Sequence, residues 1–361
     1  MGKRIGILTF SSAYNFGAVL QCYALYQTIK NLGYDVKVID YRPHYLASNP
    51  KKSLYRKIRR FLRRLLIERR FKSNDWEQLM SLYENFERKN LRLSDTCTTK
   101  EELGKVLNEF DEIVVGSDQI WNSKYNGKDE AWYGLEDGDQ RKWITYAASA
   151  GNANFTKEDL DALKKALPRF EFLSMREEFL TNKLQPLISK EIKTVVDPSL
   201  LGNPIIWERW KEIRPVDGSY ILTYQARESQ KVFDIAKRLS QEEDKIVPLD
   251  FYANVEKNGL QTPIVPPSCF ISLISNSKCL VTTSFHGVAF SIILNKPFYY
   301  VKLNDGADGR AIHLLKELGL ESRIIDDKGI KDIDPIDYNP VNSKLAELRE
   351  KSMDYLKEAL R

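Results

Sequence analysis

Four consecutive residues combine a hydroxyl, an aromatic ring, an imidazole and a flexible backbone position: Ser284, Phe285, His286 and Gly287. The apolar run before them, 279–282, predicts a buried strand, and the run after them, 288–294, predicts a helix. Backbone N–H groups at a helix start are unpaired and attract anions, and an imidazole titrates near neutral pH. The spacing predicts an anion-binding acid–base centre around His286; the alternative is a purely structural histidine.

A carboxylate occupies a comparable position in the segment 116–122, Gly-Ser-Asp-Gln-Ile-Trp-Asn, which follows the apolar run 110–115. Its small residues let the chain turn away from a sheet, and Asp118 would then project into the crevice at the strand end. A carboxylate there can take a proton from a sugar hydroxyl, and Trp121 can offer an apolar face to a sugar ring. The alternative for Asp118 is that it only caps the following turn.

Two arginines are candidates for binding an anionic substrate. Arg176 follows the short apolar run 172–175, where a guanidinium can hold a carboxylate or phosphate through two hydrogen bonds. The alternative for Arg176 is a salt bridge to Glu177 or Glu178. Arg310, after Asp-Gly at a predicted helix start, is a similar candidate.

Two further segments each allow two interpretations. The loop 11–17 supplies hydroxyls, the Asn15 amide and, with Gly17, a helix N-terminus, so it can bind a phosphate or a sugar. It can equally be a plain strand-to-helix turn. In the segment 197–199, Asp-Pro-Ser, the aspartate can act as a hinge and helix cap or as a ligand.

These candidates follow apolar runs that predict the strands of parallel sheets. The expected strands cover residues 4–10, 34–40, 110–115, 143–150, 172–175, 194–196, 220–224, 245–249, 279–282 and 298–301. Helical runs between them favour an α/β fold with Rossmann-like domains, whose ligands bind at the carboxyl ends of the strands. We assign 1–200 to a first domain, 201–342 to a second, and 343–361 to a helix that closes back onto the first. The chain lacks the G-x-G-x-x-G pattern at the first strand-to-helix turn, so the sequence does not support a dinucleotide ligand.

The segment 51–72 differs from the rest of the chain because it carries eleven Lys or Arg residues and one Glu. Its Leu, Ile and Phe residues recur at helical spacing, which predicts a basic amphipathic helix. Such a helix can present a solvated face above an apolar stripe docked on the protein, or it can bind an anionic membrane surface. A nucleic-acid partner is not expected, because the aromatic residues form no stacking ladder.

The composition is ordinary for a soluble globular protein: 361 residues, 42% hydrophobic, 29% charged, and a formal net charge of +5. The mild positive excess favours anionic partners without indicating nucleic acid. None of the four cysteines forms a CxxC pair or lies near a histidine at zinc-like spacing, so we expect buried free thiols, a reducing compartment and no metal site. The first apolar run is too short for a signal peptide, and no run reaches the length of a membrane span, so we expect a cytoplasmic protein.

The motifs, taken in order, resemble those of the polysaccharide pyruvyl transferase family. The segments that carry the resemblance are 15–21 (Asn-Phe-Gly-Ala-Val-Leu-Gln), 34–41, 116–122, 174–177 (Ser-Met-Arg-Glu), 196–200 (Val-Asp-Pro-Ser-Leu) and 284–287 (Ser-Phe-His-Gly). Each segment is short, but as an ordered set they are specific, and they span about residues 5–323.

The resemblance implies a GT-B-like fold, in which two Rossmann-like domains with parallel sheets face a central cleft that holds the active site. It also implies transfer of a pyruvyl group from phosphoenolpyruvate to two hydroxyls of a sugar, as a ketal, with release of phosphate. The turn around His286 would be the donor site. Family members can carry an arginine two places before this histidine, where the present chain has Ser284. The positive charge would then come from Arg176 or Arg310.

On this basis we expect His286 to act as the acid or to contact phosphate, and Asp118 to act as the base. The expected donor-binding residues are Arg176, Ser284, Phe285, Gly287 and Arg310. The expected acceptor-binding residues are Asn15, Gly17, Gln119, Trp121 and Asn122. Phosphoenolpyruvate would be a co-substrate, no cofactor or metal is expected, and the acceptor sugar is expected to be lipid-linked, with the protein peripheral at the inner face of the membrane. Two other hypotheses are a GT-B glycosyltransferase that uses a nucleotide sugar, and a non-catalytic, membrane-associated binding protein.

Overall fold

The computed structural model describes residues 2–43, 45, 73–134, 139, 141–151, 155–250, 256–257, 259–326 and 335–361. The basic segment 51–72 lies outside the described residues, so its helical structure and its contact with a membrane stay predictions. Across the described ranges, no helix combines the length and the apolar character that crossing a membrane requires.

The first sheet contains four parallel strands in the order β2-β1-β3-β4. They are β1 (Arg4–Leu8), β2 (Asp35–Val38), β3 (Glu112–Val115) and β4 (Lys142–Thr145). β3 is buried along its whole length, as expected for a central strand that is covered on both faces. A further parallel pair, β5 (Leu173–Met175) and β6 (Ile192–Thr194), joins β4 through bridges at Phe172 and Met175. The strand predicted at 194–196 therefore lies two residues earlier in the chain.

Helices connect and cover these strands. They are α1 (Phe16–Asn31), α3 (Ser73–Asn90), α4 (Lys100–Leu107), α5 (Lys157–Ala166), α6 (Glu178–Leu184) and α7 (Pro198–Leu201). The next helix, α8 (Ile205–Lys211), packs on α10 (Pro267–Asn276) of the C-terminal half. α1 is buried on nearly all sides, which is typical of a helix enclosed between two layers. The first residue of α1, Phe16, stacks on Phe270 of the C-terminal half at 5.2 Å between ring centroids. α1 therefore lies at the junction of the two halves.

The second sheet contains five parallel strands in the order β13-β12-β11-β7-β8. They are β7 (Tyr220–Tyr224), β8 (Lys245–Leu249), β11 (Cys279–Thr282), β12 (Phe298–Val301) and β13 (Ile324–Ile325). A small antiparallel pair, β9 (Glu256–Lys257) and β10 (Leu260–Gln261), lies beside β8. The helices of this half are α9 (Gln230–Leu239), α10 (Pro267–Asn276), α11 (Phe285–Ile293) and α12 (Gly309–Glu317).

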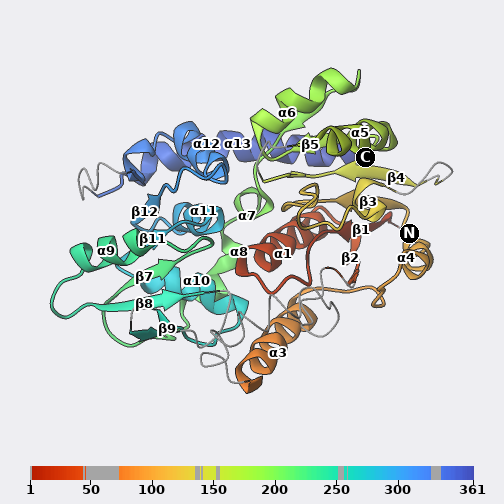
Figure 1. Ribbon diagram of the computed structural model, residues 1–361. Coiled ribbons are helices and arrows are strands. Elements are labelled where there is room, and N and C mark those ends of the chain that lie inside the picture. Colours follow the sequence, from red (N-terminus) through yellow and green to blue (C-terminus); the bar gives the residue numbers. More distant parts are fainter. Residues whose placement is uncertain are drawn as a thin grey trace.

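Both sheets follow the same doubly wound strand order, and the two halves lie side by side as separate lobes (Figure 1). In the first sheet, β1 pairs with β2 on one side and with β3 on the other. In the second sheet, β7 pairs with β8 on one side and with β11 on the other. The direction in which strands are added therefore reverses at β1 and at β7. The reversal lies between β1 and β3 in one lobe and between β7 and β11 in the other. Ligands of open α/β sheets bind at such switch points, outside the carboxyl ends of the strands.

The last helix, α13 (Tyr338–Ala359), runs from the C-terminal lobe back across the N-terminal lobe (Figure 1). It begins earlier than the predicted residue 343, because Asp337 caps it and Pro340 lies in the first turn, where a missing N–H costs little. Near its end, the Tyr355 hydroxyl donates to the Thr145 carbonyl at 2.7 Å. The end of α13 therefore contacts a strand of the first lobe.

Candidate active site

A cavity of about 200 Å³ opens between the two lobes. Its walls come from loops that follow β1, β3 and β4 on one side and β7, β11 and β12 on the other. The lining residues are Asn15, Asp118, Gln119, Asn122, Lys124, Tyr125, Gly151, Ala226, Arg227, Thr283, Ser284, Phe285, His286, Ala307 and Arg310. These loops leave the switch points of both sheets, so the cavity occupies the position where this fold class binds ligands.

His286 lies in the first turn of α11, which begins three residues earlier than the predicted helix. The Ser284 hydroxyl caps this helix by accepting a hydrogen bond from the Gly287 N–H at 3.3 Å. His286 is 8% exposed, and it lines the cavity. The structure therefore brings the imidazole and a helix N-terminus together at one wall of the cavity.

The imidazole of His286 packs directly against the backbone of α1. A Cβ atom placed on Gly17 would lie 2.0 Å from His286 Nδ1, so only glycine leaves room for the ring. Asn15 caps α1 through a 3.1 Å hydrogen bond from the Ala18 N–H to its side-chain oxygen. Gly17 does not line the cavity. The expectation that Gly17 binds the acceptor is thus corrected, because Gly17 instead supports the position of His286.

On its other side His286 faces Asp197, which follows β6. The distance between His286 Nε2 and Asp197 Oδ2 is 3.8 Å, and Nε2 has no hydrogen-bond partner among the described residues. Asp197 also accepts hydrogen bonds from the Ser199 N–H and hydroxyl at its other oxygen. Burial alone would raise the pKa of Asp197, but His286 and Arg176 outweigh burial and lower that pKa well below its usual range. Asp197 is therefore an ionised carboxylate that lies next to the imidazole.

Arg176 holds this carboxylate in place. Its guanidinium donates to Asp197 at 2.6 Å, to Glu177 at 3.1 Å and to Ser149 at 3.0 Å, and it is almost completely buried. Burial would lower the pKa of Arg176, but the two carboxylates raise it above its usual value. Arg176 does not line the 200 Å³ cavity; it lines a second, smaller cavity of about 110 Å³ together with Phe285 and Arg310. The alternative of a salt bridge to Glu177 is present in the structure, and donor binding by Arg176 stays a prediction.

Arg310 differs from Arg176 because no hydrogen bond or ion pair joins it to another described residue. It lies in the first turn of α12 and lines the cavity. Its guanidinium carbon is 5.7 Å from the centre of the Phe285 ring, and that of Arg176 is 4.9 Å from the same ring. Burial, and then repulsion by Arg176, lower the pKa of Arg310. The carboxylates of Glu177 and Asp118 offset these effects only in part, so an anion bound in the cavity would supply a closer counter-charge.

Asp118 faces the same cavity from the N-terminal lobe. Its φ of 63° is unusual for a residue with a side chain, and strained positions of this kind cluster at functional sites. Within the described ranges, its carboxylate makes no hydrogen bond or ion pair, so it does not cap the following turn. The carboxylate is therefore available to a hydrogen-bond donor of a ligand.

The rest of the segment 116–122 divides between the cavity and the core. Gln119 and Asn122 line the cavity, and the Asn122 amide donates to the Gln119 side-chain oxygen at 2.9 Å. Trp121 is 1% exposed, and its indole N–H donates to the Trp132 carbonyl at 2.9 Å. The expectation that Trp121 contacts the acceptor sugar is wrong, because its ring is packed among core residues of the N-terminal lobe.

Arg227 is a cavity residue that the sequence interpretation missed. It follows β7 and donates to the Thr283 carbonyl, the Tyr300 hydroxyl and the Asp308 carboxylate. These bonds tie the loop before α12 to the turn after β11, and so they position Arg310 relative to His286. The sequence feature that could have identified Arg227 is its position just after a predicted strand, the same feature that identified Arg176. Lys124 and Tyr125, just beyond the segment 116–122, were missed as well.

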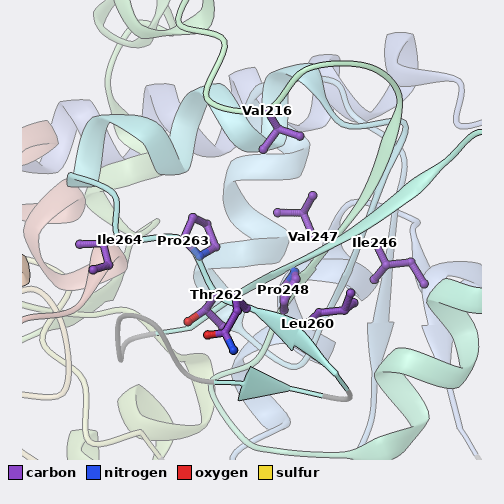
Figure 2. A pocket seen from close by; sticks show the side chains of 9 residues that line it. Val216, Ile246, Val247, Pro248, Leu260, Thr262, Pro263 and Ile264 are labelled. Atoms are coloured by element: carbon purple, nitrogen blue, oxygen red, sulfur yellow. The ribbon is translucent and has the colours of Figure 1, made fainter. Parts of the chain in front are cut away.

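A larger cavity of about 430 Å³ lies beside the edge strand β8, away from these residues (Figure 2). Its lining contains aliphatic side chains, prolines, a threonine and a glutamine, but no titratable group. It therefore offers no acid or base. In the part of the chain that the structure describes, no group of three or more His, Cys, Asp or Glu side chains is placed to hold a metal ion. All four cysteines are buried and free, as predicted.

Solved structures of low sequence identity share this fold. Anabaena Alr3699/HepE in complex with UDP-glucose has a TM-score of 0.54 at 10% identity, covering 99% of this chain and 100% of that chain. UDP-N-acetylglucosamine 2-epimerase from Rickettsia bellii has a TM-score of 0.51 at 10% identity, covering 99% and 98%. The Methanocaldococcus jannaschii UDP-GlcNAc 2-epimerase, in complex with UDP-GlcNAc and UDP, has a TM-score of 0.50 at 14% identity, covering 98% and 93%. The architecture is GT-B-like, with two Rossmann-like domains.

A family model described as polysaccharide pyruvyl transferase matches residues 15–305. A comparison with curated proteins gives no match. The range matched by the family model includes Asp118 from one lobe and His286 from the other, whereas Ala307 and Arg310 of the cavity lie beyond it. The chain belongs to the polysaccharide pyruvyl transferase family, and it is a transferase of polysaccharide biosynthesis.

Proposed function

We propose that the protein transfers the pyruvyl group of phosphoenolpyruvate to two hydroxyls of a sugar, forming a ketal and releasing phosphate. The observation that carries this proposal is the convergence of one cation without a counter-ion, Arg310, with His286 at a helix N-terminus. Opposite them in the same cavity is the unpaired carboxylate of Asp118. Family membership supports the reaction type.

The donor side fits a small dianion. Phosphoenolpyruvate carries a phosphate and a carboxylate, which need a cation and aligned N–H donors. Arg310 supplies the cation, and the first turn of α11 supplies the N–H groups. Since Arg176 is occupied by Glu177 and Asp197, Arg310 takes the place of the arginine that relatives carry at position 284.

The reaction needs one acid and one base, each contributing about 10²–10⁴-fold. In our proposal His286 protonates the methylene carbon of phosphoenolpyruvate, which makes C2 electrophilic. Asp118 accepts the proton of a sugar hydroxyl as that oxygen bonds to C2. The C2–O bond to phosphate then breaks, and phosphate leaves with the proton that Asp118 had accepted. The second hydroxyl bonds to C2 to close the ketal and passes its proton to His286, which restores the acid. Asp197, held by Arg176, keeps the His286 ring in position.

A nucleotide-sugar donor is the second candidate, because two structures with this fold hold UDP-glucose, or UDP-GlcNAc and UDP. A thermal-shift experiment separates the two donors. Phosphoenolpyruvate at about 100 times its Kd should raise the free energy of unfolding by about 2.7 kcal/mol. UDP-glucose and UDP-GlcNAc should produce no shift. A shift with a UDP-sugar and none with phosphoenolpyruvate would overturn the proposal.

The donor site itself is tested by Arg310→Gln, which should abolish the shift with phosphoenolpyruvate. Arg92→Gln is the matched control, because Arg92 pairs with Asp35 on the surface. His286→Ala should remove phosphate release in the presence of an acceptor. Undiminished release by this variant would exclude His286 from the mechanism.

We further propose that the acceptor is carried on a lipid at an anionic membrane surface. This part rests on the sequence of 51–72 alone, with its eleven basic residues. Flotation with anionic liposomes tests it, comparing wild type with a variant in which Arg59, Arg60, Arg63 and Arg64 are changed to Gln. Equal flotation of the two proteins would refute the membrane proposal and leave the proposed reaction intact.

A further inference from the structure

Tyr125 is an exposed aromatic residue at the acceptor side of the cavity. It is 55% exposed, whereas the predicted sugar contact, Trp121, is buried. The other exposed large apolar side chains of the described residues, Ile205 and Ile213, do not line this cavity. An exposed apolar ring beside a polar pocket is informative. It gains no favourable contact from water, whereas a ligand that covers it buries apolar surface.

The backbone around Tyr125 is well anchored. The Tyr125 N–H donates to the Asn122 carbonyl at 2.8 Å. The next residue, Asn126, is fully buried, and its amide donates to the Ile120 carbonyl at 2.9 Å and the Tyr133 hydroxyl at 2.7 Å. The turn is therefore fixed on the core, so the backbone from which the Tyr125 side chain projects has a defined position.

The groups beside the Tyr125 ring match the two kinds of surface that a pyranose offers. A pyranose has C–H groups that pack on an aromatic face and hydroxyls at its rim that need polar partners. Gln119 accepts a hydrogen bond from Asn122, but its amide N–H₂ donates to no other described residue. Asp118 is unpaired in the same wall. Ring, amide donor and carboxylate acceptor thus occur together on the acceptor side.

Lys124 adds a positive charge to this group. Its backbone N–H donates to the Asn122 side chain at 3.1 Å, but its ammonium group pairs with no carboxylate of the described chain. Lys128, four residues further, pairs with Glu158 at 2.9 Å and does not line the cavity. Lys124 is therefore the lysine of this turn that is available to a ligand, and it favours an anionic one.

We propose that Tyr125 and Lys124 form an acceptor subsite for a hexose that carries an anionic group, either a carboxylate or a phosphate. Tyr125 stacks on the ring, Lys124 pairs with the charge, and Gln119 and Asp118 contact the hydroxyls. That this hexose is the second substrate rests on the proposed function. The binding itself does not.

The test is a saturation-transfer NMR titration of the purified full chain with three sets of probes. These are the methyl glycosides of glucose, galactose and mannose, the corresponding hexuronic acids, and the corresponding hexose 1-phosphates. The variants are Tyr125→Ala, Tyr125→Phe and Lys124→Gln, with Lys128→Gln and Ile205→Ala as matched controls. Because the mutated side chains are exposed, melting temperatures should stay unchanged and show that every variant is folded.

We expect at least one anionic probe to bind. Tyr125→Ala should weaken its binding about tenfold, and Tyr125→Phe should keep it. Lys124→Gln should weaken it about two- to fivefold, an effect that high salt removes in wild type. Hexuronic acids and hexose 1-phosphates then show whether the carboxylate or the phosphate is recognised. Equal binding by Tyr125→Ala, or no binding of any probe by wild type, would overturn the subsite, and equal binding of neutral and anionic probes would overturn the role of Lys124.

The thermal shift that phosphoenolpyruvate causes, measured on the same preparations, distinguishes this inference from the proposed function. Hexose binding that depends on Tyr125, without a phosphoenolpyruvate shift, would support the subsite and refute the proposed donor. A phosphoenolpyruvate shift without hexose binding would support the donor and refute the subsite.

Discussion

Gly17→Ala is a single-methyl change aimed at the position of His286. The new Cβ would lie 2.0 Å from Nδ1, 2.3 Å from Cγ and 2.7 Å from Cε1 of the ring, whereas ordinary contact begins at 3.4 Å. Moving Nδ1 from 2.0 Å to 3.4 Å requires a retreat of at least about 1.4 Å. A misplacement of about 1 Å at a reacting group can cost about 10²-fold in rate. We therefore expect phosphate release to fall about 10²-fold.

The effect of Gly17→Ala on the free energy of unfolding should have opposite signs in wild type and in His286→Ala. In a helix, Gly→Ala normally stabilises by about 0.5–1 kcal/mol, but overpacking costs about 1–3 kcal/mol. In wild type the clash with His286 should dominate, so Gly17→Ala should lower the free energy of unfolding. In the His286→Ala background the imidazole ring is gone, so Gly17→Ala should raise the free energy of unfolding. The coupling between the two positions should be about 1–3 kcal/mol.

Urea unfolding of the four proteins in this cycle gives the coupling, and phosphate release gives the rate. Gly104→Ala is the control, because Gly104 is also inside a helix but has no atom within 4 Å of its would-be Cβ. It should stabilise in both backgrounds. If Gly17→Ala behaves like this control, or costs the same with and without the imidazole, then His286 does not pack on α1 as described.

Three further perturbations test other parts of the structure. Burial raises the pKa of Glu87 to about 7 from 4.5, so the folded chain holds this proton more tightly. The unfolding free energy should therefore fall by about 3 kcal/mol between pH 4.5 and 7, and Glu87→Gln should remove this decrease in urea titrations at the two pH values. Asp197→Asn leaves the buried Arg176 with one carboxylate fewer and should cost about 3–5 kcal/mol in the same assay at pH 7; a cost below about 1 kcal/mol would contradict the ion pair. Phe285→Leu removes a ring that has the guanidinium carbons of Arg176 and Arg310 at 4.9 Å and 5.7 Å from its centre. It should cost about 0.5–2 kcal/mol in cation–π contact, measured by thermal melting, and an unchanged melting temperature would contradict this contact.

The sheets and the edge that carries the site could be predicted from the sequence, because each strand is an apolar run that ends in small or polar residues. The segment 279–287 contains both signals: four buried strand residues and a serine that caps the next helix. Which of the two arginines is unpaired could not be predicted this way. Arg176 directly follows a strand and Arg310 lies in the first turn of a helix, and neither position shows whether a carboxylate lies nearby. Asp197, which occupies Arg176, is 21 residues away in the chain.

The wrong expectation for Trp121 has a similar physical origin. A turn exposes some side chains and buries others, and residue types alone do not show which. In 116–122 the polar residues Asp118, Gln119 and Asn122 line the cavity, while the tryptophan fills the core behind them. Tyr125 lies outside the recognisable motif, and its exposure follows from the anchoring of Asn126, which the sequence pattern does not reveal.

The return of α13 to the first lobe joins the lobes by two covalent crossings, one leading into β7 and one along this helix. Between these crossings the two lobes share one hydrophobic core, which includes Phe16, Phe270 and Leu356 of α13. Removing α13 would therefore expose apolar surface of both lobes to water.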